Sequence, residues 1–171
     1  TSHEAESENQ HDPHIWTSPV MAKAIAGNIR DALIGLDPDH GAAYRDGFHD
    51  FAGKLNALDA ELATLFRSTP GLKFMVFHPS WGYFADQYGL TQIAIEKEGK
   101  QPGAKALAAL VDQAIAENIK VVFVQPQFDR KLAQKIADAI HGEVIVIDPL
   151  SADYLGNLRK AAHQIIGMQN P

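Results

Sequence analysis

The longest periodic pattern of apolar residues lies in the first half of the chain. Seven apolar side chains follow one another at spacings of four and three residues: Tyr44, Phe48, Phe51, Leu55, Leu58, Leu62 and Leu65. This spacing places all of them on one stripe of an α-helix. The pattern predicts a helix from about Asp39 to Arg67, roughly 45 Å long at ~1.5 Å per residue. Such a helix fits either a bundle or coiled coil, or a rigid strut between two domains.

A shorter helix precedes this one and opens with a start signal. Ser18 is the expected N-cap and Pro19 the first helical residue. We expect the helix to run to about Ile34 and Gly35 to close it. The pair Asp37-Pro38 then repeats the start signal for the long helix.

The pattern changes after residue 71, where short apolar runs alternate with helical ones. Runs rich in Val, Ile and Phe predict strands at 73–77, 91–95, 120–124 and 143–147. Helices are predicted near 81–88, 103–117, 130–141 and 153–166. Four consecutive strand and helix units predict an α/β fold, with a four-stranded, mainly parallel sheet flanked by helices and preceded by the long helix.

Composition narrows the class of protein. The chain has 171 residues, 46% hydrophobic and 21% charged, which is the balance of a globular protein that folds. Its net charge is -6 and its basic residues are scattered, so nucleic acid is excluded as an expected partner. The absence of Cys excludes thiolate metal sites and disulfides. The residues from Thr1 to Gln10 are polar and do not have the pattern of a signal peptide, so we expect that any export signal has been removed.

The candidate chemistry rests on dispersed residues, because the chain contains no HExxH, GxSxG, GxxxxGK or GxGxxG motif. His78 follows the first predicted strand and Asp148 the fourth. Ligands in parallel sheets bind at the carboxyl ends of strands, so these two are expected at one edge. His14, next to Ile15 and Trp16, is the third candidate metal ligand.

Each candidate also has a structural interpretation. His14 could be a partly buried histidine bonded to a backbone carbonyl, and Asp148, before Pro149, could be a turn or capping residue. The polar run from 96 to 101 contains Glu96 and Glu98, which we interpret as a solvated loop. The remaining histidines fit solvated helix faces, a helix end or a flexible tail: His3, His11, His40, His49, His141 and His163.

Four motifs occur in order along most of the chain. They are Asp12-Pro13-His14-Ile15-Trp16, Phe77-His78-Pro79-Ser80-Trp81-Gly82-Tyr83-Phe84, Val122-Phe123-Val124-Gln125-Pro126-Gln127-Phe128 and Ile147-Asp148-Pro149-Leu150. In this order the chain resembles the solute-binding proteins of bacterial zinc and manganese ABC importers, the zinc-uptake receptor type in particular. The resemblance extends from about Asp12 to Ile166 and corresponds to the carboxy-terminal half of such a receptor.

The resemblance implies two α/β lobes joined by one long helix, with the metal between them. It assigns 1–17 to a polar, His-containing loop and the end of the amino-terminal lobe, 18–36 to a helix of or near that lobe, 37–68 to the connecting helix and 69–171 to the carboxy-terminal metal-binding lobe. By position it makes His14, His78 and Asp148 the metal ligands. His14 then depends on the amino-terminal lobe, whereas His78 and Asp148 share one lobe. His3 and His11 resemble a short version of the family's histidine-rich segment.

The chain departs from the family pattern at several points. The family's first histidine ligand lies upstream of Thr1, so the expected site is incomplete. The cysteine pair of some zinc receptors is missing, and Gln125 stands where relatives commonly have an acidic residue. A histidine at position 78 favours Zn(II) over Mn(II), because manganese receptors of the family place a carboxylate there and imidazole suits zinc.

The implied function is a non-enzymatic receptor that binds Zn(II) in the cell envelope and delivers it to an ABC transporter permease. The expected location is the periplasm or, as an anchored protein, the cell surface. The alternatives are a manganese or other divalent-metal receptor, a metal-dependent hydrolase or oxygenase using two His and one Asp, and a structural fragment without a functional metal site. An exposed apolar helix and a half-built cleft also make self-association of the chain an expectation.

Overall fold

The carboxy-terminal part of the protein is built on one parallel sheet. The computed structural model describes residues 12–97, 99–128 and 130–167. Its four strands are β1 (Lys73–Val76), β2 (Thr91–Ala94), β3 (Val121–Val124) and β4 (Glu143–Val146), in the order β2-β1-β3-β4. Every neighbouring pair is parallel. This confirms the α/β fold and the four predicted strands, and the sheet is fully rather than mainly parallel.

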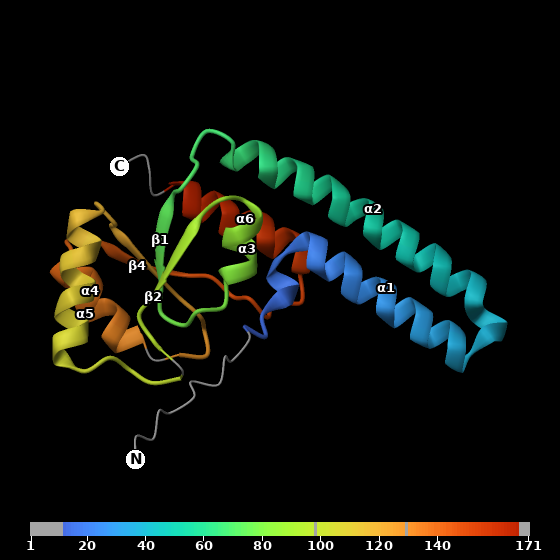
Figure 1. Cartoon of the computed structure of the whole chain (residues 1–171), viewed down its shortest axis with the longest axis horizontal. Helices are drawn as coiled ribbons and strands as arrows, with labels where there is room; N and C mark the ends of the chain where they lie inside the picture. The colour runs from blue at the N-terminus through green and yellow to red at the C-terminus, as the bar shows by residue number, and fades with distance from the viewer. Residues whose placement is uncertain (1–11, 98, 129, 168–171) are drawn as a thin grey trace, which may run out of the picture.

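Helices cover both faces of the sheet (Figure 1). One face carries α4 (Ala104–Ala116) and α5 (Arg130–Ala139), and the other carries α3 (Gly82–Gln87) and α6 (Tyr154–Gly167) together with the end of α2. Residues alternate between the two faces along a strand. Phe74 and Val76 of β1 therefore join one apolar cluster, and Met75 joins the other. This two-sided burial explains why the central strand β3 is apolar throughout and why β1 is apolar after its first residue.

Two long helices precede the sheet and run antiparallel to each other (Figure 1). They are α1 (Pro19–Leu36) and α2 (Gly41–Phe66), joined by a short 3-10 turn, η2 (Pro38–His40). The Ser18 side chain caps α1 by accepting a hydrogen bond from the Met21 amide, as expected. The prediction that Gly35 closes α1 was wrong. The helix includes Gly35 and ends at Leu36, two residues after the predicted Ile34, because Pro38 disfavours helical geometry at Asp37, where φ is -141° and ψ 73°.

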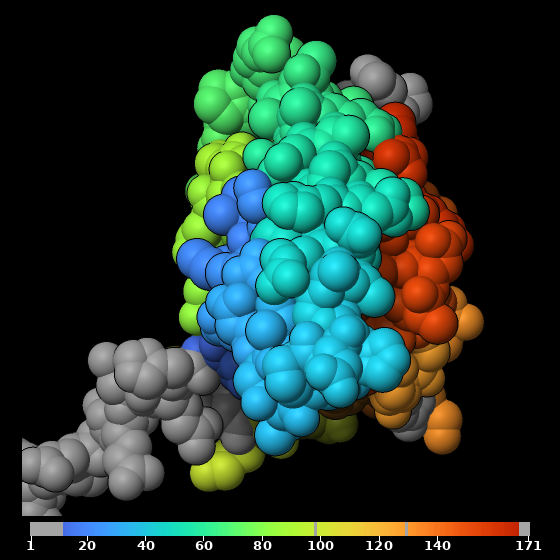
Figure 2. Space-filling model, turned by 90° about the vertical axis from the view of Figure 1, so that its right-hand side faces the viewer, coloured from blue at the N-terminus to red at the C-terminus, as the bar shows by residue number. Residues whose placement is uncertain are grey.

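The apolar stripe of α2 packs against α1 in its first half and against the sheet in its second half. Its amino-terminal half, with Phe48, packs against α1 beside Gly27, outside the sheet. In its carboxy-terminal half, Leu55, Leu58 and Leu62 are fully buried, and the last two belong to the cluster on the sheet. Figure 2 shows α1 and α2 side by side, with α6 flanking α2. Within residues 12–97, 99–128 and 130–167, no helix combines the length and apolar character that crossing a bilayer requires.

Candidate metal centre

A small cavity of about 190 Å³ lies at the carboxyl edge of the sheet. It is lined by residues that follow β1, β3 and β4 and by the segment before α1: His14, Trp16, His78, Gln125, Gln127, Phe128, Pro149 and Leu150. His78 is the second residue after β1 and Gln125 the first after β3. The sheet edge predicted to carry the site therefore does carry a cavity with two of the candidate ligands in its wall.

The segment that carries His14 is fastened directly to the sheet domain. His14 precedes a 3-10 turn, η1 (Ile15–Thr17), and the Trp16 indole Nε1 donates to the Pro149 carbonyl at 2.9 Å. The Tyr154 hydroxyl donates to the Trp16 carbonyl at 2.7 Å. Burial raises the pKa of Tyr154, which keeps the hydroxyl protonated as a donor. The carboxy-terminal part of the chain thus positions His14, which we had expected to depend on an amino-terminal lobe.

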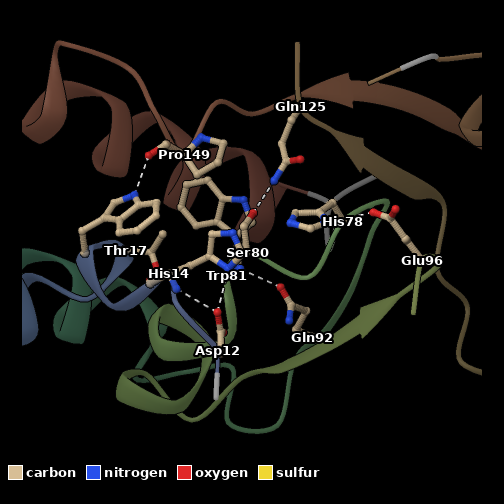
Figure 3. Close-up of polar contacts among 11 residues, drawn as sticks. Asp12, His14, Thr17, His78, Ser80, Trp81, Gln92, Glu96, Gln125 and Pro149 are labelled. Atoms are coloured by element: carbon tan, nitrogen blue, oxygen red, sulfur yellow. Dashed lines mark hydrogen bonds and ion pairs between the residues drawn. The ribbon is translucent and has the colours of Figure 1, made fainter. Parts of the chain in front are cut away.

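The rings of His14 and His78 lie close together. Their centroids are 5.2 Å apart and their planes are 82° apart, an edge-to-face arrangement. Asp12 supports His14 locally: its Oδ1 lies 2.6 Å from Nδ1 of the ring and accepts the His14 backbone N–H at 2.9 Å. Figure 3 shows Asp12, His14 and His78 around this edge of the sheet.

His78 is held from a neighbouring strand. Its Nδ1 lies 2.7 Å from Oε2 of Glu96, and its ring stacks on Phe128 with centroids 5.0 Å apart. Glu96 is only 7% exposed. The interpretation of Glu96 as part of a solvated loop was therefore wrong, although Lys97, Gly99 and the two residues after it are exposed. Glu96 is the second residue after β2. The argument from the carboxyl ends of strands, which selected His78 and Asp148 as candidates, could therefore have selected Glu96 too.

Asp148 does not line the cavity with the two histidines. Its Oδ1 accepts the Leu150 backbone N–H at 3.0 Å and a hydrogen bond from Gln127 Nε2 at 3.3 Å. In the part of the chain that the structure describes, no group of three or more His, Cys, Asp or Glu side chains is arranged to hold a metal ion. The structure brings His14 and His78 together and leaves Asp148 in a turn beside them. His3 and His11 lie outside the described residues.

Gln125 forms part of the buried wall of the cavity. It is 4% exposed, and its Nε2 donates to the Ser80 hydroxyl (Figure 3). Its Oε1 is buried without a hydrogen-bond partner among the described residues. A neutral amide therefore faces the site, with hydrogen-bonding capacity left over, where a carboxylate would add negative charge.

Comparison with known families identifies the chain. The family model described as "ZnuA: Zinc-uptake complex component A periplasmic" matches residues 1–167. The chain belongs to this family. The two histidines at the cavity come from the Asp12-Pro13-His14 and His78-Pro79 motifs on which the resemblance was based.

Relatives in the ZnuA family match most of this chain but extend well beyond it. The high-affinity zinc uptake system protein ZnuA of Brucella abortus (strain 2308) is 31% identical over 147 residues, which is 84% of this chain and 44% of that protein. ZnuA of Bacillus subtilis (strain 168) is 32% identical over 141 residues, or 81% of this chain and 44% of that protein. The chain spans less than half the length of these two relatives.

Solved ZnuA structures share the fold. A crystal structure of ZnuA superimposes with a TM-score of 0.89 and 42% identity, over 92% of this chain and 60% of that chain. A ZnuA deletion mutant with zinc bound gives a TM-score of 0.88 and 41% identity, over 94% of this chain and 62% of that chain.

Proposed function

We propose that this chain is the carboxy-terminal part of a zinc receptor, which binds Zn(II) in the cell envelope and delivers it to the permease of an ABC importer. The observation that carries the proposal is the pair of imidazoles in the cavity wall, with ring centroids 5.2 Å apart. Imidazole nitrogen is a preferred zinc ligand. Membership of the ZnuA family supports the transport role and a periplasmic or cell-surface location.

The proposed ligands are His14, His78 and Asp148. Each imidazole would bind through Nε2, because its Nδ1 contacts a carboxylate. Asp148 stands beside the cavity, directly before Pro149 of its wall. Its Oδ1 is held by two neutral N–H donors, against which a divalent cation is the stronger electrostatic partner. Three such ligands leave zinc one position for a further ligand, in keeping with the greater length of the ZnuA relatives.

The domain division is part of the same proposal. Residues 69–171 would form the metal-binding lobe, 37–68 the connecting helix, and 1–17 and 18–36 the end of an amino-terminal lobe and a helix of or near it. The apolar side chains exposed along α1 support this, since such a stripe calls for a partner. Ile29, Leu33 and Leu36, spaced by four and three residues, are 55%, 38% and 84% exposed.

We infer a receptor rather than a hydrolase, because the family is one of uptake components. A metal titration tests the proposal: we expect zinc to bind more tightly than manganese, because two of the three ligands are imidazoles. Tighter manganese binding would favour the manganese receptor, and zinc-dependent turnover of ester or phosphoester substrates would favour the hydrolase. An absence of binding to either metal would favour the structural fragment.

A further inference from the structure

We propose that Glu96 and Asp12 are positioning residues for the metal site: each accepts a hydrogen bond from Nδ1–H of one imidazole and so presents the Nε2 lone pair of that ring to the metal. The inference rests on the proposed function, since it concerns the two histidines of that site. It adds two carboxylates that were not candidate ligands: Asp12, which belongs to the first motif, and Glu96, which lies outside all four motifs. Each carboxylate holds a different imidazole.

Glu96 reaches His78 from the next strand of the sheet. Its Oε2 lies 2.7 Å from His78 Nδ1, and its backbone N–H donates to the carbonyl of Phe77, the residue directly before His78, at 2.8 Å. Main chain and side chain together hold Glu96 against the same short segment. The side chain of Glu96 is 8% exposed, and burying a carboxylate is costly unless it is paired. A glutamate in a solvated loop would instead be exposed to solvent, so the burial and pairing of Glu96 indicate a role at His78.

Asp12 holds His14 from within its own segment. Its Oδ1 contacts both the backbone N–H and the ring Nδ1 of His14, at 2.9 Å and 2.6 Å. The other carboxylate oxygen, Oδ2, lies against the first residue of α3, where a Cβ placed on Gly82 would be 2.7 Å from it. The absence of a side chain at Gly82 therefore leaves the room that the Asp12 carboxylate occupies.

The two contacts define the tautomer of each ring. An ionised carboxylate can only accept, so the ring nitrogen it contacts must carry the hydrogen. In a neutral imidazole the other nitrogen, Nε2, then has a bare lone pair, which is the form that binds a metal. Nε2 of neither ring has a hydrogen-bond partner among the described residues. Aromatic contacts orient the rings further, with Trp16 beside His14 and Phe128 stacked on His78.

Long-range ¹H–¹⁵N spectra of the histidine side chains test this directly in the metal-free protein, because they distinguish the two tautomers. The spectra should be recorded near pH 8.5, above the ordinary imidazole pKa of about 6.5, and the His78 signals assigned by their loss in His78→Ala. We expect the Nδ1–H tautomer in the wild type and in Glu96→Gln, whose amide oxygen still accepts. In Glu96→Leu we expect a shift towards Nε2–H. Glu143→Leu, an exposed residue at the opposite ends of the strands, is the control.

Zinc titration of the same variants gives the second readout. Loss of the partner behind a metal-binding histidine typically weakens affinity about 10- to 100-fold, so we expect that loss in Glu96→Leu, a smaller one in Glu96→Gln and none in Glu143→Leu. Glu96→Leu with unchanged tautomer and unchanged affinity would overturn the inference, as would an Nε2–H tautomer in the wild type. If the wild type shows the Nδ1–H tautomer but binds no zinc, the proposed function fails while the assignment of Glu96 stands.

Discussion

The imidazoles of His14 and His78 meet edge to face with their centroids 5.2 Å apart, although one precedes the first helix and the other follows the first strand. Only tertiary structure brings them together. The contacts that do so come from the carboxyl edge of the sheet: Trp16 to Pro149 and Tyr154 to Trp16. The pairing of the two rings is therefore held by contacts within this chain.

Replacement of Gly82 by alanine should change the position of His14 indirectly, through Asp12. The added methyl group would lie 2.7 Å from Asp12 Oδ2 and push the carboxylate away from its bonds to His14. We expect zinc affinity to fall by about tenfold, as for loss of the carboxylate behind a ligand, measured by calorimetric titration. Gly47→Ala on α2, where a Cβ meets nothing within 4 Å, is the control. Equal affinity in the two variants would contradict this role of Asp12.

The Asp148→Asn variant tests whether Asp148 is a metal ligand or only a residue that stabilises a turn. The amide oxygen of asparagine can still accept the Leu150 N–H, so we expect the free energy of unfolding to change by less than about 0.5 kcal/mol. The lost negative charge should nevertheless weaken zinc binding at least about tenfold, since carboxylate ligands must be ionised. Asp153→Asn is a matched control, because Asp153 also accepts a backbone N–H, from Gly156. Unchanged zinc affinity would leave Asp148 as a turn residue alone.

Much of the fold was predictable from local patterns of apolar residues in the sequence. The Val-, Ile- and Phe-rich runs became the four strands, and the stripe from Tyr44 to Leu65 became α2. These patterns are predictable because burial on a strand or helix face imposes a fixed period. The predicted end of α1 was two residues too early, since Gly35 and Pro38 are two competing helix-stop signals.

The site was less predictable, because it depends on distances that sequence does not encode locally. His78 could be placed at the sheet edge by its position after a strand. Glu96 also follows a strand, but it begins the polar run 96–101, which we interpreted as a solvated loop. The contact between Asp12 Oδ2 and Gly82 could not be predicted from either of the two motifs that contain these residues. Whether Asp148 joins the histidines remains a prediction, for which the Asp148→Asn titration is the test.

Replacement of Tyr154 by phenylalanine should loosen the His14 segment. The variant loses the hydroxyl that donates to the Trp16 carbonyl at 2.7 Å, which should lower the free energy of unfolding by about 1 kcal/mol. Tyr83→Phe is the control, since the Tyr83 hydroxyl has no hydrogen-bond partner in the described ranges. Urea denaturation measures both, and equal stability of the two variants would contradict the anchoring role.

The same tyrosine predicts how stability depends on alkaline pH. Burial raises the pKa of Tyr154 in the folded protein, so its contribution is fully present below the unfolded pKa of about 10 and is lost as pH rises above it. Burial also raises the pKa of Tyr88. We therefore expect Tyr154→Phe to reduce, and not abolish, the loss of stability between about pH 10 and 11. An equally steep loss in the variant would contradict the shift.

The exposed stripe on α1 predicts self-association of the chain in isolation. Burying Ile29 and Leu33 against a second copy would remove apolar surface from water. We expect sedimentation velocity to show concentration-dependent association that the double variant Ile29→Ser, Leu33→Ser reduces. Ile115→Ser on α4, with 55% exposure at a single apolar position, is the control. A protein that stays monomeric at all concentrations would contradict this expectation.

The measurement that tests the central claim most directly is calorimetric zinc titration of the wild type and His78→Ala, with His49→Ala as control because His49 is exposed on α2, away from the cavity. We expect the wild type and His49→Ala to bind zinc alike. His78→Ala should bind more than about a hundredfold more weakly, since removal of a ligand costs more than removal of its hydrogen-bond partner. Equal zinc affinity in all three proteins would contradict a metal site built on His78.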